Sequence, residues 1–453
     1  MAEFLRNTDA FTWSMESDPR LRSTIVSLIL LDRVPDWAEL VNRIELLDRT
    51  VSNFRKLVVP SPPPAPPRWE LDKHFDLAFH LRRVTAPAPG SLDTLLEMAR
   101  VAAMADFDRA RPLWEITLID GLEDGGAALL CKMHHSLTDG IGAIQIAMTL
   151  FDRSEQYETR PLPEEPLAAA GRSLAGIRDV IGYEAGQAES VLTGSVKAVP
   201  GIIAGSIRHP LRTLTDTLST AASIYRTVRP ISKPGSPIVR DRTLDRRLAV
   251  HQVPKKALRK AGAAGGGSLN DAFIAAVVGG LRRYHEKHDV PVDQLITSMP
   301  ISLRTPTDPV AGNRLTLMRF ALPAAIADPA QRIRAIHEQT GKMRNEKSLA
   351  HTQPIAGALN LMPRWYVGSV LRHIDFVASD VPGLPIPVFL AGAAVRMQYA
   401  FGPTIGAGVN VTLLSYVDTC AIGINVDAGA VPDFEVFFDC LVGGFDEVLA
   451  LAD

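Results

Sequence analysis

The chain has 453 residues, 46% of them hydrophobic, and a formal net charge of −2 at pH 7. This length is too great for one compact core and predicts two domains, while the near-balanced charge argues against nucleic acid as a partner. Cys131, Cys420 and Cys440 lie far apart in the sequence without the spacing of a metal site, which indicates reduced, buried thiols in a cytosolic protein.

Targeting and membrane signals are weak. The N-terminal stretch MAEFLRNTDAFTW carries acidic residues early and lacks the apolar core of a signal peptide. No unbroken apolar run approaches the roughly 18–20 residues of a membrane span. We therefore expect a protein that is soluble or lies on a membrane without crossing it.

The first predicted elements alternate between strand and helix. Residues 24–34 (TIVSLILLDRV) are β-branched and apolar and predict a buried strand. The helical spacing of residues 35–51 predicts a helix that starts at Pro35 and Asp36. Residues 60–69 (PSPPPAPPRW) contain too many prolines for a helix or a central strand, so they predict an extended connector.

A second group of elements leads to an unusual motif. A helix is predicted from residue 91, with Ser91 as its N-cap. EITLIDGL and GAALLCKM predict two strands around the turn EDGG at residues 123–126, and an apolar stretch of helical length ends near Phe151. HHSLTDG, residues 134–140, therefore lies where a central strand gives way to a helix.

The middle of the chain, residues 156–244, differs from both flanks. A proline-rich acidic linker precedes an amphipathic helical pattern and then a basic segment in which apolar residues alternate with cations. The cations of that segment are Arg208, Arg212, Arg226, Arg229, Lys233, Arg240 and Arg242. This composition suits contact with an anionic lipid surface, but it is equally typical of a solvated helical crossover between two domains.

The second half again mixes strands and helices. Strands are predicted at residues 244–254, 295–304 and 313–323, and in the segments 373–392 and 408–427. Ser268 and Asp271 resemble a capping box at the start of a long helix. Helices interrupted by Pro354 and Pro363 and a final helix after residue 431 complete the pattern, which predicts an α/β protein with domains at residues 1–155 and 245–453.

Three hypotheses explain HHSLTDG. A metal site is disfavoured, because neighbouring residues on a strand point to opposite faces and no further ligand is evident, so we expect none. Thr138 or Asp139 could cap the following helix, which explains the aspartate but neither histidine. A histidine could act as a general base, since imidazole titrates near neutral pH. No GxSxG-type nucleophile accompanies it.

Six blocks in the same order resemble one family. HHSLTDG matches the HHxxxDG signature of coenzyme A-dependent acyltransferases, which also occurs in condensation domains of peptide synthetases. The other blocks resemble those of the bacterial wax ester synthase/diacylglycerol acyltransferases: RPLWEITLIDGL, GSLNDAFIAAVVGGLRRY, MPISLR with GNRLTLMRFALP, SDVPGLPIP and GVNVTLLSY. Asp380 departs from the family's usual asparagine, Leu384 interrupts its Pro-Gly-Pro, and the opening of the chain matches it only loosely.

The resemblance implies a fold and a reaction. The fold would comprise two chloramphenicol-acetyltransferase-like domains, each a mixed sheet packed with helices, joined by a helical crossover with a channel between them. His135 would be the general base that activates a hydroxyl for attack on an acyl-CoA thioester. His134 and Gly140 would support it, and Asp139 would hold the shape of the site.

Further roles follow from the matched blocks. Arg304 would pair with Asp139, Asn270 would line the channel, and Asn410 and Thr412 would donate hydrogen bonds to the oxyanion. Pro112, Leu113 and Trp114 would form the channel wall. No cofactor is expected, because acyl-CoA is a co-substrate.

The expected acceptor is diacylglycerol or a long-chain alcohol. The protein would be cytoplasmic and peripherally associated with the inner membrane or lipid droplets. Two other interpretations stay open at this point: a condensation-type acyltransferase with a carrier-bound donor, and a non-catalytic lipid-binding protein of the same fold.

Overall fold

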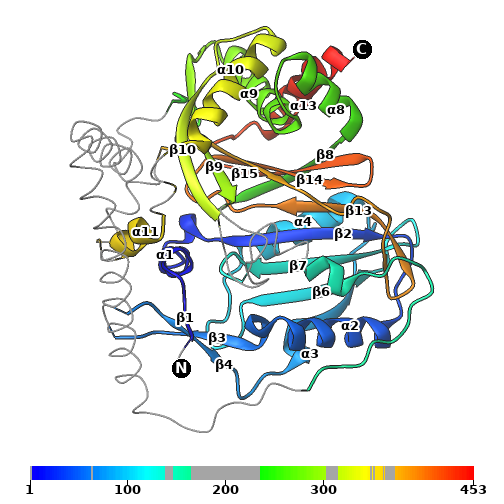
Figure 1. The fold of residues 1–453 in the computed structure, drawn as a ribbon. Helices are drawn as coiled ribbons and strands as arrows, with labels where there is room; N and C mark the ends of the chain where they lie inside the picture. The colour runs from blue at the N-terminus through cyan, green and yellow to red at the C-terminus, as the bar shows by residue number, and fades with distance from the viewer. Residues whose placement is uncertain are drawn as a thin grey trace, which may run out of the picture.

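Two large sheets between outer helices make up the molecule. The computed structural model describes residues 3–62, 65–137, 146–164, 235–302, 315–346, 349, 352–360, 362 and 373–452. Their strands form two six-stranded sheets and one three-stranded sheet. In Figure 1 the C-terminal sheet lies above the N-terminal sheet, with α8, α9, α10 and α13 above and α2 and α3 below. This α/β architecture is the predicted one.

The N-terminal sheet has the strand order β12-β13-β2-β7-β6-β5. Its strands are β2 (Thr24–Leu31), β5 (Leu81–Thr85), β6 (Trp114–Asp120), β7 (Ala127–His134), β12 (Phe389–Leu390) and β13 (Ala393–Phe401). β7 is buried on both faces, with only Met133 partly exposed, because its apolar run leaves no polar face to turn to water. The predicted strands at β2, β6 and β7 are confirmed.

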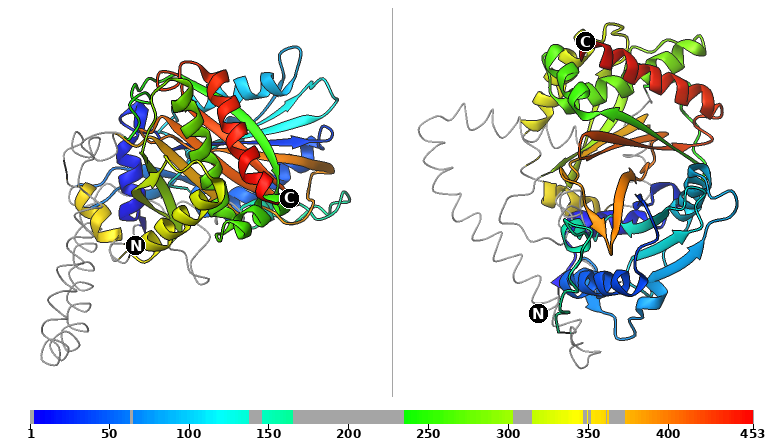
Figure 2. Two further views of the ribbon diagram at one scale, coloured as in Figure 1. Left: turned by 90° about the horizontal axis from the view of Figure 1, so that it is seen from above. Right: turned by 90° about the vertical axis from the view of Figure 1, so that its right-hand side faces the viewer.

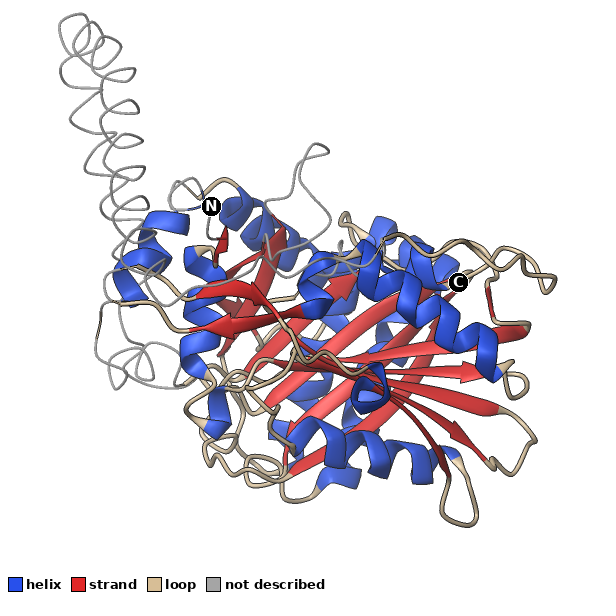
Figure 3. Ribbon diagram, turned by 90° about the horizontal axis from the view of Figure 1, so that it is seen from below, coloured by secondary structure: helices blue, strands red, loops and turns tan. Residues whose placement is uncertain are grey.

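The helices of this half start where their caps predict. Asp36 accepts the Glu39 N–H at 2.9 Å at the start of α2 (Trp37–Thr50), and Ser91 accepts the Thr94 N–H at 3.3 Å at the start of α4 (Leu92–Met104). The shorter helices are α1 (Asn7–Met15), η1 (Pro19–Leu21), η2 (Ser52–Arg55) and α3 (Leu77–His80). Figure 3 distinguishes helices from strands by colour and shows helices flanking the strands.

The proline-rich connector has a defined place. It links β3 (Lys56–Val59) to β4 (Arg68–Leu71), which pair antiparallel and, with β1 (Glu3–Phe4), form the three-stranded sheet. The connector therefore closes a small sheet at the edge of the N-terminal half.

The C-terminal sheet has the order β10-β9-β11-β14-β15-β8. Its strands are β8 (Arg246–Pro254), β9 (Gln294–Ser302), β10 (Leu315–Pro323), β11 (Phe376–Val381), β14 (Val409–Tyr416) and β15 (Thr419–Asp427). β11 runs parallel to both neighbours, but it pairs with β9 only at Phe376 and Val377. Beyond that point the two strands diverge, so the sheet divides.

Five α-helices and one short 3-10 helix belong to the described part of the C-terminal half: α8 (Lys255–Ala264), α9 (Leu269–Lys287), α10 (Pro329–Arg344), α11 (Thr352–Asn360), α13 (Phe434–Leu449) and η4 (Ala450–Ala452). The predicted capping box of Ser268 and Asp271 is present at the start of α9. α9 crosses α13 closely, since a Cβ on Gly444 would lie 2.4 Å from the Gly280 nitrogen. Sequence analysis assigned no element to α8 or α10.

Two strands from the second half of the sequence, β12 and β13, belong to the N-terminal sheet, and β13 contacts both halves. β13 pairs with β2, with Phe401 opposite Val26, although it lies in the second half of the sequence. The right-hand view of Figure 2 shows this orange strand extending into the blue and cyan half. The backbone of β13 also touches the C-terminal sheet, because a Cβ on Gly423 would lie 2.0 Å from the Ala400 carbonyl oxygen. The predicted boundary at residue 245 did not anticipate this exchange.

The predicted helical crossover, residues 156–244, falls largely outside the described residues. Its described ends, 156–164 and 235–244, contain no helix. Within the described part of the chain, no helix combines the length and apolar character that a membrane crossing needs.

Candidate functional site

The HHSLTDG motif begins at the end of β7. His134 is the last residue of that strand and lies opposite Thr24 of β2, and residues 135–137 form a turn. The His134 N–H donates to the Leu113 carbonyl at 3.0 Å, and the His135 N–H donates to the Ser23 carbonyl at 3.0 Å. Backbone segments on both sides therefore fix the position of the two histidines.

The two imidazoles have different surroundings. His134 is 0% exposed, whereas His135 is partly exposed. The edges or faces of Trp13 and Phe107 pack against the His134 ring at centroid distances of 5.7 and 6.2 Å. Of the two rings, only that of His135 can meet a substrate without rearrangement of the core.

Both ring nitrogens of His134 have hydrogen-bond partners. Its Nδ1 lies 2.7 Å from the Ser136 hydroxyl and accepts the Ser136 N–H at 3.1 Å. Its Nε2 lies 3.1 Å from Oε1 of Glu16, which is itself 3% exposed. The predicted supporting histidine is thus held in a closed network. Glu16 was not predicted as a site residue, since no spacing pattern in the sequence links it to a motif 118 residues away.

Four residues that the sequence pointed to lie outside the described residues. They are Thr138, Asp139 and Gly140 of the motif and Arg304 of the MPISLR block. The proposed pairing of Asp139 with Arg304 therefore stays a prediction.

All three residues of the predicted channel wall, Pro112, Leu113 and Trp114, are buried, and their role as a channel wall stays a prediction. Leu113 and Trp114 are 0% exposed and belong to the core of the N-terminal half. The Trp114 Nε1–H donates to the Phe54 carbonyl at 2.7 Å, and its ring stacks on His80 at 4.5 Å. These side chains fill the core beside Pro112, because β6 begins at Trp114 and turns the indole inward.

Asn410 and Thr412 form hydrogen bonds with Gly402 and Pro403, in the loop that follows β13. The Thr412 hydroxyl donates to Asn410 Oδ1 at 2.8 Å, and Asn410 Nδ2 donates to the Pro403 carbonyl at 2.8 Å. Phe401, the last residue of β13, lies opposite Val26 of β2, and His134, the last residue of β7, lies opposite Thr24 of the same strand. The loop after β13 therefore begins at the edge of the N-terminal sheet where the two histidines lie. Asn410 and Thr412 thus lie towards the histidine end of the N-terminal sheet. The hydroxyl hydrogen of Thr412 is already donated to Asn410.

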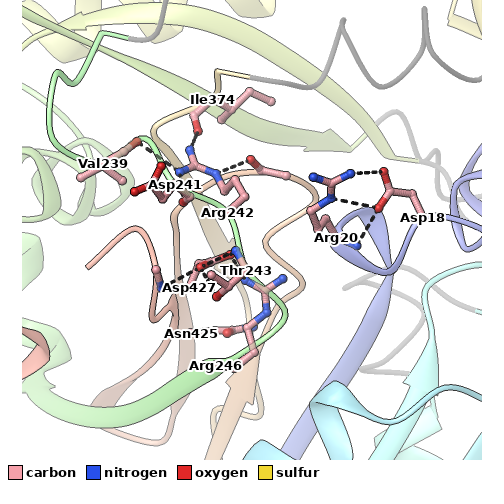
Figure 4. Close-up of polar contacts among 12 residues, drawn as sticks. Asp18, Arg20, Val239, Asp241, Arg242, Thr243, Arg246, Ile374, Asn425 and Asp427 are labelled. Carbon is pink, nitrogen blue, oxygen red and sulfur yellow. Dashed lines mark hydrogen bonds and ion pairs between the residues drawn. The ribbon is translucent and has the colours of Figure 1, made fainter. Parts of the chain in front are cut away.

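The same loop is tied to both halves of the chain. Figure 4 shows the polar contacts around Arg242, which connect these segments. Arg242 Nε donates to the Gly406 carbonyl at 2.8 Å, and the Gly406 N–H donates to the Arg20 carbonyl at 3.1 Å. Arg20 lies in η1, shortly before Ser23, whose carbonyl holds His135. None of these contacts was predicted from the sequence.

Asn270 lines a pocket where the C-terminal sheet divides. The pocket has a volume of about 460 Å³. Its lining comprises Asn270, Met299, Pro300, Phe320, Thr340, Met343, Arg344, Leu349, Ala378 and Asp380. Met299 and Pro300 come from β9, and Ala378 and Asp380 come from β11, so the pocket occupies the gap between these diverging strands. Sequence analysis singled out only Asn270 as a site residue here.

Asp380 is the acidic group of this pocket. Asp380 is itself exposed on β11, but desolvation by the surrounding protein raises the pKa of its carboxyl to about 6, and the positive charge of Lys255 opposes that rise. The carboxyl thus loses its charge in mildly acidic solution, which the family's usual asparagine would not do. Within the described residues, no group of three or more His, Cys, Asp or Glu side chains is arranged to hold a metal ion.

Two family models match most of the chain. Residues 5–273 match the wax ester synthase/diacylglycerol acyltransferase catalytic domain, and residues 311–448 match the WS/DGAT C-terminal domain. A relative from Mycobacterium tuberculosis, which bears the name of a proposed diacylglycerol O-acyltransferase, is 36% identical over 447 residues. The alignment covers 96% of this chain and 90% of that protein.

Solved structures share the fold. The wax ester synthase/diacylglycerol acyltransferase of Marinobacter aquaeolei VT8 superposes with a TM-score of 0.65 at 23% identity, covering 99% of both chains. The starter condensation domain of rhizomide synthetase, solved in complex with C8-CoA, gives a TM-score of 0.63 at 14% identity and covers 100% of this chain and 95% of that one. At these identities the likeness concerns the two-domain fold alone.

Proposed function

Since the chain belongs to the wax ester synthase/diacylglycerol acyltransferase family and is an acyltransferase of that family, we propose that it transfers a long-chain acyl group from acyl-CoA to an alcohol. The acceptor is the hydroxyl of diacylglycerol, a long-chain alcohol, or both. His135 is the general base. The enzyme works in the cytoplasm, peripherally attached to the inner membrane or to lipid droplets.

The observation that carries this proposal is the contrast between the two histidines. His134 is sealed and hydrogen-bonded, while His135 follows it in a turn and is partly exposed. A general base must reach the proton that it removes. Among the two histidines of the motif, His135 is the one whose surroundings allow this.

The reaction needs one proton transfer in each direction. Neutral His135 takes the proton of the acceptor hydroxyl while its oxygen attacks the carbonyl carbon of the thioester. The tetrahedral oxyanion then collapses, the C–S bond breaks, and the imidazolium returns its proton to the thiolate of coenzyme A. Atoms and charge balance without a cofactor. Asn410, Thr412 and Arg304 are the candidates for stabilising charge around this step, and Asn270 is a candidate for substrate contact.

A product assay tests the proposal. The purified protein is given palmitoyl-CoA with either diacylglycerol or hexadecanol, and ester formation and release of the free thiol are measured together. We expect equal amounts of ester and thiol with at least one acceptor. Thiol release without ester would indicate hydrolysis and would contradict the acceptor assignment. Ester formation only from a carrier-bound acyl group would favour a condensation-type enzyme, whose domains share this fold.

A further inference from the structure

A buried carboxylate lies directly behind the histidine pair. Glu16 follows the last residue of α1 and is 3% exposed. Within the described chain its carboxylate has no arginine or lysine within ion-pair distance, and its charged-group contact is with His134. Burial of a carboxylate is costly unless hydrogen bonds compensate for the lost water. Its neighbours therefore show what the carboxylate does.

The contacts of His134 fix which ring nitrogen carries hydrogen. The Ser136 N–H points at Nδ1 at 3.1 Å, so Nδ1 must present a lone pair. The ring hydrogen of neutral His134 therefore resides on Nε2, which faces Glu16 Oε1 at 3.1 Å. His134 is a hydrogen-bond donor to Glu16 and cannot accept a substrate proton at that nitrogen.

The same carboxylate oxygen also accepts a hydrogen bond from Ser23, the residue whose carbonyl binds the His135 N–H. Oε1 accepts the Ser23 N–H at 2.5 Å, and the Ser23 carbonyl accepts the His135 N–H at 3.0 Å. Glu16 thus binds two neighbours of His135. It binds the side chain of His134, which precedes His135 in the chain, and the backbone N–H of Ser23, which lies beside His135. His134 and Ser23, which hold the backbone of His135 from two sides, are therefore both bound to Oε1 of Glu16.

We propose that Glu16 is a positioning residue, whose side-chain oxygen joins His134 to Ser23 and thereby fixes the backbone of His135. This role rests on the proposed function of His135 as the base. It depends on the reach and acceptor geometry of the side chain more than on its charge. Glutamine can supply the same acceptor at the same reach, whereas aspartate is shorter by one methylene group, and alanine supplies no acceptor.

Three variants, E16A, E16D and E16Q, test this geometry. A displacement of the order of 1 Å in a catalytic group can lower a rate by about 10²-fold. We expect E16A to lower kcat by roughly 10²-fold with KM for palmitoyl-CoA changed by less than about 3-fold. E16Q should keep kcat within about 10-fold of the parent, and E16D should fall between E16Q and E16A. The surface variant E97A is the matched control, since Glu97 is an exposed residue of α4 that forms an ion pair with Arg100.

The order of the variants decides between reach and charge. If E16D retained more activity than E16Q, charge would matter more than reach, and the positioning role would be wrong. A folded E16A with parental kcat would also overturn it. If E16A does not fold, the comparison of E16Q with E16D still separates the two explanations.

A second readout needs no substrate. Nitrogen-15 labelling of histidine distinguishes the two neutral tautomers, and we expect the Nε2–H form of His134 in the parent and in every variant, because the Ser136 N–H occupies Nδ1; the Nε2 hydrogen should exchange faster in E16A, which lacks its acceptor. Amide exchange at His135 should be faster by about 10-fold in E16A and E16D. Unchanged exchange at the Nε2 hydrogen of His134 and at the His135 amide would refute the inference even if the acyl-transfer proposal held. The expected changes in a protein that forms no ester would refute only the proposed function.

Discussion

Gly423 is the point at which the C-terminal sheet touches the backbone of β13, and Gly423→Ala tests that contact. The added Cβ would lie 2.0 Å from the Ala400 carbonyl oxygen and 2.9 Å from its carbon. Real Cβ atoms essentially never approach closer than 3.0 Å, so the two strands would have to separate by about 1 Å. Overpacking of this kind costs about 1–3 kcal/mol. We expect the free energy of unfolding to fall by about 2 kcal/mol.

A displacement of β13 would also affect the candidate functional site. β13 leads into the loop that Asn410 and Thr412 hold, so a shift of that strand should also lower kcat by at least about 10-fold. Urea unfolding followed by tryptophan fluorescence gives the first quantity, and the ester-forming assay gives the second.

Gly341→Ala is the matched control. Nothing lies within 4 Å of a Cβ at this position in α10, and alanine favours a helix over glycine. This variant should be as stable as the parent or more stable by up to about 1 kcal/mol. If Gly423→Ala behaved like Gly341→Ala, within about 0.5 kcal/mol, the two sheets would not meet as described.

Three further variants separate stability from chemistry. Arg43→Met leaves the buried Glu39 carboxylate, now 2.8 Å from the guanidinium, without its cation and removes one of the two arginines that pair with Asp152, and it should lower the unfolding free energy by about 3–5 kcal/mol in denaturant titrations. Trp114→Phe should cost about 1–3 kcal/mol but leave kcat within about 3-fold, as expected of a core residue; a specific change in KM for acyl-CoA would support the channel-wall assignment. Asp380→Asn removes a carboxyl whose pKa in the folded protein, about 6, exceeds the ordinary value of 3.8. The parent should therefore lose stability relative to the variant as pH rises from about 4 to 6. The unfolding midpoints of the two proteins, measured between pH 4 and 8, should diverge in that range and stay apart above it. Parallel midpoints for the two proteins would show that the Asp380 carboxyl is not perturbed.

Local signals predicted the elements well. Asp36, Ser91 and the pair Ser268 and Asp271 mark helix starts because their side chains accept N–H groups that have no partner within the helix. Apolar runs marked β2 and β7, because strands that are largely buried need little polar alternation. The position of HHSLTDG at the end of a central strand followed directly from these assignments.

Long-range pairing could not be predicted in this way. β13 (AAVRMQYAF) was assigned no element, yet it completes the N-terminal sheet beside β2, about 370 residues away in sequence. Glu16 reaches His134 only because α1 folds against the end of β7. Trp114 belongs to a motif whose resemblance suggested a channel, but the alternation of side chains along β6 turns it into the core. Each of these features depends on tertiary contacts that no short stretch of sequence encodes.

The most direct test of the general-base proposal replaces the partly exposed imidazole alone. His135→Ala keeps the backbone N–H that binds Ser23, so the protein should remain folded and bind palmitoyl-CoA as before. Loss of a general base costs about 10²–10⁴-fold, so single-turnover ester formation should slow by at least about 10²-fold. The exposed His74 provides the control His74→Ala, which should react at the parental rate. A His135→Ala protein that forms ester as fast as His74→Ala would contradict the central claim.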